Sequence, residues 1–183
     1  MINQNLVRTF ICINFPDEVI KEVARVQSLM EKRFTGKFTE LENLHLTLKF
    51  LGEISKETLE KTRLELSKIK FPIFEANLED LGTFSIKGSP KIIWIKIAGK
   101  PIYELQKQID ISLSQLFKPE ERFMSHLTIA RIKYIKDKEY FDQTLKNITV
   151  KKIKFPVNSF KLMSSDLKPM GPVYSLIEEY FLQ

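Results

Sequence analysis

Two copies of a short motif, His45-Leu46-Thr47-Leu48 and His126-Leu127-Thr128-Ile129, decide how this chain folds and what it can do. The sequence contains two histidines in total, and each of them opens one copy. A matching Leu, Thr and aliphatic residue follows a given histidine by chance on the order of once in a thousand. The repeat therefore indicates a shared role for the two histidines.

Both copies are apolar and contain β-branched residues, which is typical of β-strands. Side chains alternate between the two faces of a strand, so His45 should share a face with Thr47, and His126 with Thr128. The aliphatic residues of each copy should then face the core. Two such strands facing each other would surround a small anion with two proton-transfer groups and two hydroxyl donors.

The same alternation assigns places to side chains just beyond the motifs. Lys49 is expected on the face of His45 and Thr47, where it would add a cation. Arg131 is expected on the face opposite His126, so it would act only from the end of the strand. Phe50 and Trp94 are most simply core residues, and stacking on a nucleobase is the lesser alternative.

Composition indicates a globular chain with a basic surface. The 183 residues are 43% apolar and 28% charged, with a net charge of +6 (29 − 23), which favours phosphate-rich partners. Cys12 is the single cysteine, which excludes an internal disulfide and a cysteine-based zinc site. No run of 18 uncharged apolar residues occurs, so no membrane span is predicted, and a reducing cytoplasm is the default location.

Periodicity predicts alternating strands and helices. Pro16 and Pro101 stand at helix starts, and Ser55 is a plausible N-cap. Helices are expected over 16–34, 55–69, 102–117 and 136–147, and strands over 6–15, 38–51, 74–84, 92–97, 148–160 and 174–181.

The two motifs lie 81 residues apart (126 − 45), and a strand–helix–strand order precedes each of them. This spacing predicts a duplicated unit, folded as a single bilobal domain over residues 1–183. We expect an α+β fold with two lobes related by a pseudo-twofold axis around a central cleft. Each lobe should hold an antiparallel or mixed sheet with helices outside it.

A pair of histidines suits displacement at phosphorus. The unperturbed imidazole titrates near ~6.5, so one ring can accept a proton while the other gives one. The hydroxyls of Thr47 and Thr128 would donate to the non-bridging oxygens. No carboxylate stands at ligand spacing beside either histidine, which argues against a metal site. Nucleophilic serine catalysis would need one base and one orienting carboxylate rather than two equivalent histidines.

The segments His45 to Gly52 (HLTLKFLG) and Ser125 to Arg131 (SHLTIAR) resemble the 2H phosphoesterase superfamily. More narrowly, the chain resembles the bacterial and archaeal RNA 2′,3′-cyclic phosphodiesterases, historically called 2′-5′ RNA ligases. The resemblance covers nearly the whole chain and includes segments 8–11, 42–44, 82–84, 90–94 and 165–174. One departure is Ser125, which stands where a proline often precedes the second histidine.

The resemblance implies hydrolysis of a terminal 2′,3′-cyclic phosphate on RNA to a 2′-phosphate, without a metal or any other cofactor. His45 would be the proton donor to the ribose O3′, and His126 the proton acceptor that activates water. Thr47, Thr128 and Arg131 would bind the phosphate, with Lys49 a weaker candidate. The expected partner is RNA such as tRNA halves, and the expected protein is a cytoplasmic monomer.

Three alternatives remain open from the sequence. The histidine roles can be reversed. The chain can be a 2H esterase for other substrates, which include small cyclic nucleotides, 2′,5′-linked oligonucleotides and RNA halves joined by ligation. It can also be an RNA-end-binding protein without turnover, although the intact histidine pair argues against this.

Overall fold

The computed structural model describes residues 6–169 and 171–183. Its strands are β1 (Val7–Asn14), β2 (Thr35–Phe38), β3 (His45–Ile54), β4 (Phe74–Ile86), β5 (Ser89–Ala98), β6 (His126–Tyr134), β7 (Lys154–Val157), β8 (Ser159–Lys168) and β9 (Gly171–Phe181). Its helices are α1 (Asp17–Leu29), α2 (Lys56–Ser67), α3 (Lys100–Ser112) and α4 (Lys138–Asn147), with a short 3₁₀ turn η1 (Leu41–Asn43). The predicted α+β fold is confirmed.

The strands form one curled sheet in the order β7-β4-β5-β6-β3-β1-β8-β9, and β2 pairs with β6. The pairings are antiparallel throughout the described strands. Read outward from the centre, β3, β1, β8 and β9 on one side correspond to β6, β5, β4 and β7 on the other. The two motif strands, β3 and β6, are therefore neighbours at the middle of the sheet. The inferred duplication of one domain stays a prediction.

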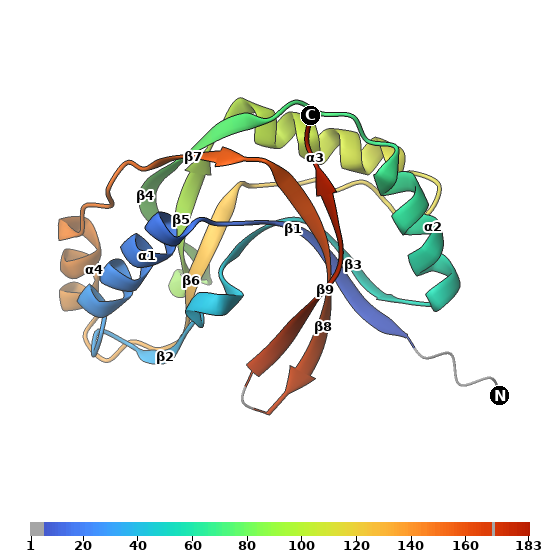
Figure 1. Ribbon diagram of the computed structural model, residues 1–183. Helices are drawn as coiled ribbons and strands as arrows, with labels where there is room; N and C mark the ends of the chain where they lie inside the picture. The colour runs from blue at the N-terminus through green and yellow to red at the C-terminus, as the bar shows by residue number, and fades with distance from the viewer. Residues whose placement is uncertain (1–5, 170) are drawn as a thin grey trace.

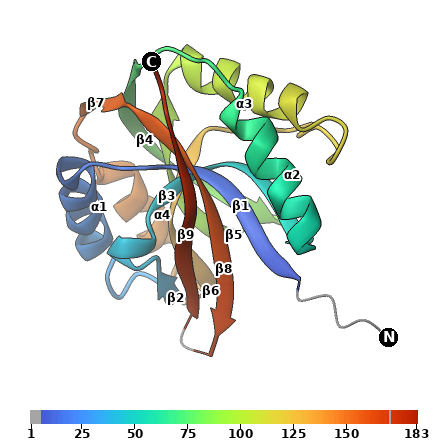
Figure 2. The ribbon, with the colours of Figure 1, turned by 45° about the vertical axis from the view of Figure 1, so that its right-hand side comes forward.

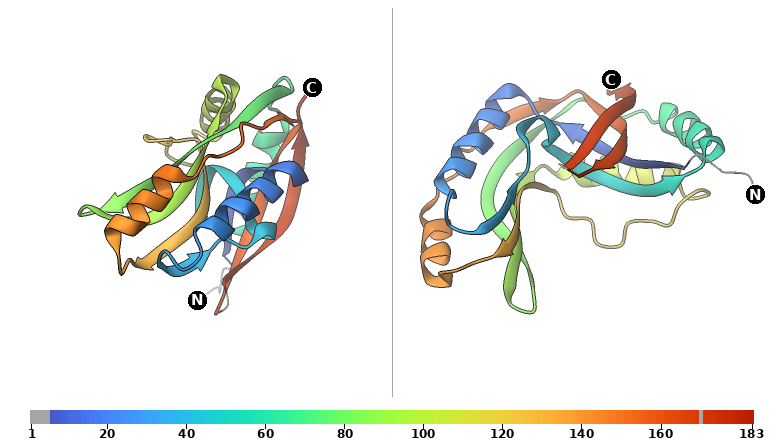
Figure 3. Two further views of the ribbon diagram at one scale, coloured as in Figure 1. Left: turned by 90° about the vertical axis from the view of Figure 1, so that its left-hand side faces the viewer. Right: turned by 90° about the horizontal axis from the view of Figure 1, so that it is seen from below.

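The helices cover the outside of the arch that the sheet forms (Figure 1). Helices α1 and α4 lie beside one half of the arch, and α2 and α3 beside the other (Figures 1 and 2). The β8–β9 hairpin extends away from the arch on its concave side (Figures 1 and 3). Aliphatic side chains from both motif strands, including Leu46, Leu48, Leu127 and Ile129, are buried in the core as predicted.

Several predicted element bounds were wrong, and most errors came from helix ends and extended loops. α1 ends at Leu29 rather than near residue 34, and α3 ends at Ser112 rather than near 117. The strand predicted over 38–51 is divided by η1, and the strand predicted over 148–160 is divided into β7 and the start of β8. Ser55 does cap α2, because its hydroxyl accepts a hydrogen bond from the Thr58 N–H at 3.1 Å. The closing segment 165–174 includes Met170, which lies outside the described residues.

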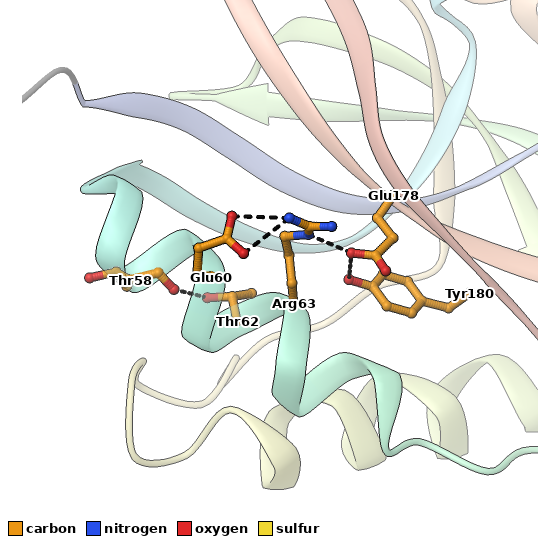
Figure 4. Close-up of polar contacts among 6 residues, drawn as sticks. All are labelled: Thr58, Glu60, Thr62, Arg63, Glu178 and Tyr180. Atoms are coloured by element: carbon orange, nitrogen blue, oxygen red, sulfur yellow. Dashed lines mark hydrogen bonds and ion pairs between the residues drawn. The ribbon is translucent and has the colours of Figure 1, made fainter.

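Polar contacts fasten α2 to the last strand (Figure 4). The Arg63 side chain donates to Glu178 of β9 at 2.6 Å and to Glu60 of its own helix at 3.0 Å. Tyr180 also donates to Glu178, at 3.2 Å. These contacts fix the outer strand relative to the helix.

Candidate active site

The two motif strands meet at one residue pair, Leu46 opposite Leu127. Both leucines are buried, so the side chains on either side of this pair point away from the core. Antiparallel order directs His45 toward Thr128, and Thr47 toward His126, across the junction. The repeat thus brings the two motif histidines together at the centre of the sheet.

Each histidine ring is oriented by a backbone carbonyl two residues before it. His45 Nδ1 lies 2.8 Å from the Asn43 carbonyl oxygen, and His126 Nδ1 lies 2.7 Å from the Met124 carbonyl oxygen. A carbonyl can only accept, so Nδ1 carries the proton in both rings. In the neutral form of each ring, Nε2 is therefore the nitrogen that can accept a proton. The two histidine rings are oriented in the same way, each by the carbonyl two residues before it.

Aromatic side chains flank both imidazoles. His45 contacts Phe10 and Tyr174, with ring centroids 4.8 Å and 5.3 Å away. His126 contacts Phe84 at 5.0 Å and Trp94 at 6.4 Å. These walls limit rotation of each ring and exclude water from its sides.

Matched β-bulges interrupt both motif strands directly after the threonine. In β3, Thr47 pairs with Cys12 and Lys49 with Ile11, so Leu48 has no partner across that ladder. In β6, Thr128 pairs with Trp94 and Ala130 with Ile93, so Ile129 has none. The carbonyl freed at Ile129 accepts from Gln27 Nε2 of α1 at 3.0 Å and from the Thr39 N–H at 2.9 Å. A bulge offsets the alternation by one residue, so side chains beyond it change faces.

The bulge corrects the position predicted for Arg131. Simple alternation put Arg131 opposite His126, whereas the extra residue returns it to the histidine face. In agreement, the positive charge of Arg131 lowers the pKa of His45 and also acts on Tyr174. Arg131 thus lies at the site on the same side as both imidazoles.

The bulge also corrects the position predicted for Lys49. Instead of facing the site beside Thr47, the Lys49 ammonium forms a buried ion pair with Asp110 of α3 and donates to the Lys118 carbonyl at 2.7 Å. The Asp110 carboxylate also accepts from Gln106 Nε2 at 2.7 Å and from the Glu120 N–H at 2.9 Å. Lys49 therefore joins β3 to the segment that leads into His126.

The charges around this ion pair explain the titration of Asp110. Burial by itself would raise the pKa of the Asp110 carboxyl. The hydrogen bonds from Lys49, Glu120 and Gln106, together with the Lys49 charge, outweigh burial, and the pKa falls below its ordinary value. The Asp110 carboxyl is therefore ionised at neutral pH, and both of its oxygens accept hydrogen bonds.

Phe50 occupies the position in β3 that Arg131 occupies in β6 (131 − 50 = 81). Its prediction as a core residue was wrong, because 67% of the side chain is exposed. The Phe50 ring lies 6.3 Å from that of Phe10, next to His45. The two halves of the site thus differ, with an aromatic ring on one side and a guanidinium on the other. Trp94 is half-buried beside His126.

Burial lowers the pKa of His45 below its ordinary value. The positive charges of Arg131 and His126 lower it further, and the hydrogen bond with the Asn43 carbonyl partly opposes them. His45 in the free protein is consequently a weaker base than an exposed imidazole. An anion bound between these groups would raise its pKa again, because a negative charge stabilises the imidazolium.

Thr47 and Thr128 are half-buried, and within the described part of the chain neither hydroxyl has an intramolecular hydrogen bond. Both hydroxyls are thus available to an oxyanion. Within residues 6–169 and 171–183, no group of three or more His, Cys, Asp or Glu side chains is arranged to hold a metal ion. The described helices also include none that is long and apolar enough to cross a bilayer.

The fold and the repeated motif define a phosphoesterase of the 2H type, and the comparisons agree. Residues 13–94 and 96–174 match the family model described as LigT like phosphoesterase. The chain belongs to this family.

The relatives include a Methanocaldococcus jannaschii protein that is 37% identical over 95% of this chain and 100% of its own length, and a Thermotoga maritima protein that is 33% identical over 94% of each. Both are named RNA 2′,3′-cyclic phosphodiesterase. A Thermus thermophilus crystal structure superposes with a TM-score of 0.83 at 27% identity, covering 95% of this chain and 97% of that one. Escherichia coli LigT in complex with 3′-AMP superposes with a TM-score of 0.78 at 21% identity, covering 97% and 99%, which shows the shared fold.

Some site features had no clear signal in the sequence. The carbonyls of Asn43 and Met124 are backbone groups, so no residue type marks them. Gln27, which supports the second bulge, lies in an ordinary helical pattern. Tyr174 was interpreted as fixing the closing segment, whereas its ring packs against His45.

Proposed function

We propose that this chain is a metal-independent RNA 2′,3′-cyclic phosphodiesterase that opens the cyclic phosphate at an RNA 3′ end and leaves a 2′-phosphate. The observation that carries the proposal is the matched orientation of two imidazoles, each held through Nδ1 by the carbonyl two residues earlier. Both rings then present Nε2 for proton transfer. This arrangement supplies an acid and a base without a further cofactor.

In the proposed reaction His126 Nε2 accepts a proton from water as the water oxygen attacks phosphorus. The bond from phosphorus to O3′ breaks, and His45 Nε2 gives its proton to O3′. The negative charge that develops on the non-bridging oxygens is stabilised by the hydroxyls of Thr47 and Thr128 and by the guanidinium of Arg131. Atoms balance, because one water is consumed and one hydroxyl and one phosphomonoester form.

The lowered pKa of His45 in the free protein would favour a base at this position. The anionic diester reverses this preference, because its charge lies close to His45 and offsets the charges of Arg131 and His126. We therefore retain His45 as the acid. Reversal of the roles would place the leaving oxygen beside His126 instead.

The test is an oligonucleotide that ends in a 2′,3′-cyclic phosphate, incubated with the protein in the presence of EDTA. We expect ring opening to the 2′-phosphate, identified against 2′- and 3′-phosphate standards. His45→Ala and His126→Ala should each lower the rate by about 10²–10⁴-fold. A 3′-phosphate product, or activity that disappears with EDTA and returns with metal, would refute the proposal.

The proposal extends to the setting of the reaction. The net charge of +6 supports an RNA partner such as tRNA halves, and the buried, unpaired thiol of Cys12 is compatible with a reducing cytoplasm. We propose that the protein acts there as a monomer. RNA with a free 5′-hydroxyl, added to the same assay, tests whether that hydroxyl replaces water and yields a 2′-5′ linkage.

A further inference from the structure

The two carbonyls that orient the histidine rings are held by different kinds of local structure. The Asn43 carbonyl belongs to η1, a turn that is closed by a hydrogen bond from the Asn43 N–H to the Glu40 carbonyl at 2.9 Å. The Met124 carbonyl lies in the described segment 113–125, which joins α3 to β6 and contains neither helix nor strand (Figures 1 and 3). The orientation of His126 therefore depends on a carbonyl outside regular secondary structure.

Apolar burial does not hold the middle of this segment in place. All five residues of the turn 118–122 are exposed. A cavity of about 470 Å³ opens between the turn and α3, and its lining includes Gln106 and Asp110 of the helix together with Pro119 and Glu120 of the turn. The turn thus borders an open space rather than closely packed side chains. Polar contacts have to fix its position.

One buried carboxylate of α3 supplies these contacts. The Asp110 carboxylate accepts a hydrogen bond from the Glu120 N–H at 2.9 Å. It also forms an ion pair with Lys49, whose ammonium donates to the Lys118 carbonyl at 2.7 Å. Gln106 Nε2 donates to the same carboxylate at 2.7 Å and so fixes its orientation. Asp110 therefore holds the backbone of the turn directly at Glu120 and through Lys49 at Lys118.

We propose that Asp110 is a positioning residue for His126 and acts through the backbone between Glu120 and Met124. This stretch is then held on both sides, because the Ser125 carbonyl accepts a hydrogen bond from a backbone N–H of β5 at 3.2 Å. The inference rests on the proposed function, in which His126 Nε2 is the base. Release of the turn would move the Met124 carbonyl and turn the ring, and a misplacement of about 1 Å costs on the order of 10²-fold in rate.

The experiment compares two double variants that both lack the ion pair. Lys49→Met/Asp110→Leu removes the acceptor for the Glu120 N–H, whereas Lys49→Met/Asp110→Asn keeps a side-chain oxygen for it. On the 2′,3′-cyclic phosphate, the leucine variant should lower kcat by roughly 10–100-fold with little change in KM. The asparagine variant should recover most of that kcat. Lys100→Met/Glu104→Leu removes an exposed ion pair from the same helix, and this control should keep the native kcat.

Nuclear magnetic resonance of the imidazoles separates positioning from general destabilisation. The chain contains two histidines, so His45→Ala and His126→Ala assign both ring signals. In the leucine variant the Nδ1–H of His126 should lose its protection from solvent exchange, while that of His45 should exchange as in the native protein. An unchanged His126 signal, or an equal change at both rings, would overturn the proposal.

The native protein supplies a second test if the leucine variant folds poorly. In urea below the unfolding transition, exchange of the Glu120 amide and of the His126 Nδ1–H should rise together, ahead of the His45 Nδ1–H. Exchange rates that rise independently would overturn the proposal, as would a Glu120 amide that exchanges as fast as that of Glu121. If the native protein leaves the cyclic phosphate intact, the proposed function fails, whereas the exchange rates still test the positioning.

Discussion

Replacing Lys49 with methionine separates a structural role for this residue from a role in phosphate binding. The side chains of Lys49 and Asp110 are only 4% and 10% exposed, so the substitution leaves a carboxylate buried without its cation. Loss of one partner from a buried ion pair costs about 3–5 kcal/mol. That is a large fraction of the roughly 5–15 kcal/mol by which folded domains are stable. Lys49→Met should therefore lower the denaturation midpoint strongly.

The assay is urea denaturation followed by circular dichroism, with kcat and KM measured well below the unfolding temperature. Lys49→Met/Asp110→Leu should recover much of the lost stability, because both charges are then removed from the interior. Lys61→Met is the control, since Lys61 pairs with Glu57 on an exposed helix face, and it should leave the midpoint unchanged. A Lys49→Met protein of native stability but with a strongly raised KM would show that Lys49 binds the substrate and that the bulge was misinterpreted.

Three other substitutions give distinct outcomes. Arg131→Met removes a positive charge that lowers the pKa of His45. The limb of the kcat/KM–pH profile that belongs to His45 should therefore move to higher pH. A limb that stays in place would contradict the position assigned to Arg131. Thr128→Val should lower kcat/KM by roughly 10–100-fold, the size of a hydrogen bond to a charged group, and a rate equal to that of the native protein would remove this hydroxyl from the oxyanion site. Hydrogen bonds from Arg25 are the main reason why the pKa of Glu22 in the folded protein lies below its ordinary value. The ionised Glu22 carboxylate therefore stabilises the fold at every pH above the pKa that Glu22 has in the unfolded chain. This stabilisation is lost as the pH falls through the lower pKa of the folded state. Glu22→Gln should thus destabilise the protein at pH 7 and flatten the loss of stability in acid, which thermal melts between pH 3 and about pH 7 will check.

The repeated motif and the periodicity around it predicted the α+β class, and the motif pointed to the two histidines and two threonines that lie on either side of the Leu46–Leu127 pair. Alternation in the first three residues of each copy correctly placed the aliphatic side chains in the core, because a short strand segment without a bulge has a fixed period of two. The N-cap at Ser55 was also predictable, since capping depends on local residue type.

Alternation failed for Lys49, Phe50 and Arg131 for a single physical reason. All three follow the bulges at Leu48 and Ile129, and an inserted residue exchanges the faces of everything beyond it. The bulge at Ile129 depends on partners distant in sequence, among them Gln27. Its position is therefore a property of tertiary packing, which residue patterns along one strand do not contain.

The most direct test of paired histidine catalysis replaces the bridging O3′ of the cyclic phosphate with sulfur. A thiolate leaves phosphorus without a proton, so the substrate no longer needs a general acid. The account predicts that His45→Ala loses about 10²–10⁴-fold on the oxygen substrate and recovers most of that rate on the sulfur substrate, whereas His126→Ala stays impaired on both. If His45→Ala and His126→Ala are equally impaired on the sulfur substrate, the assignment of His45 as the acid is contradicted. If both variants react at the native rate on the oxygen substrate, paired histidine catalysis itself is contradicted.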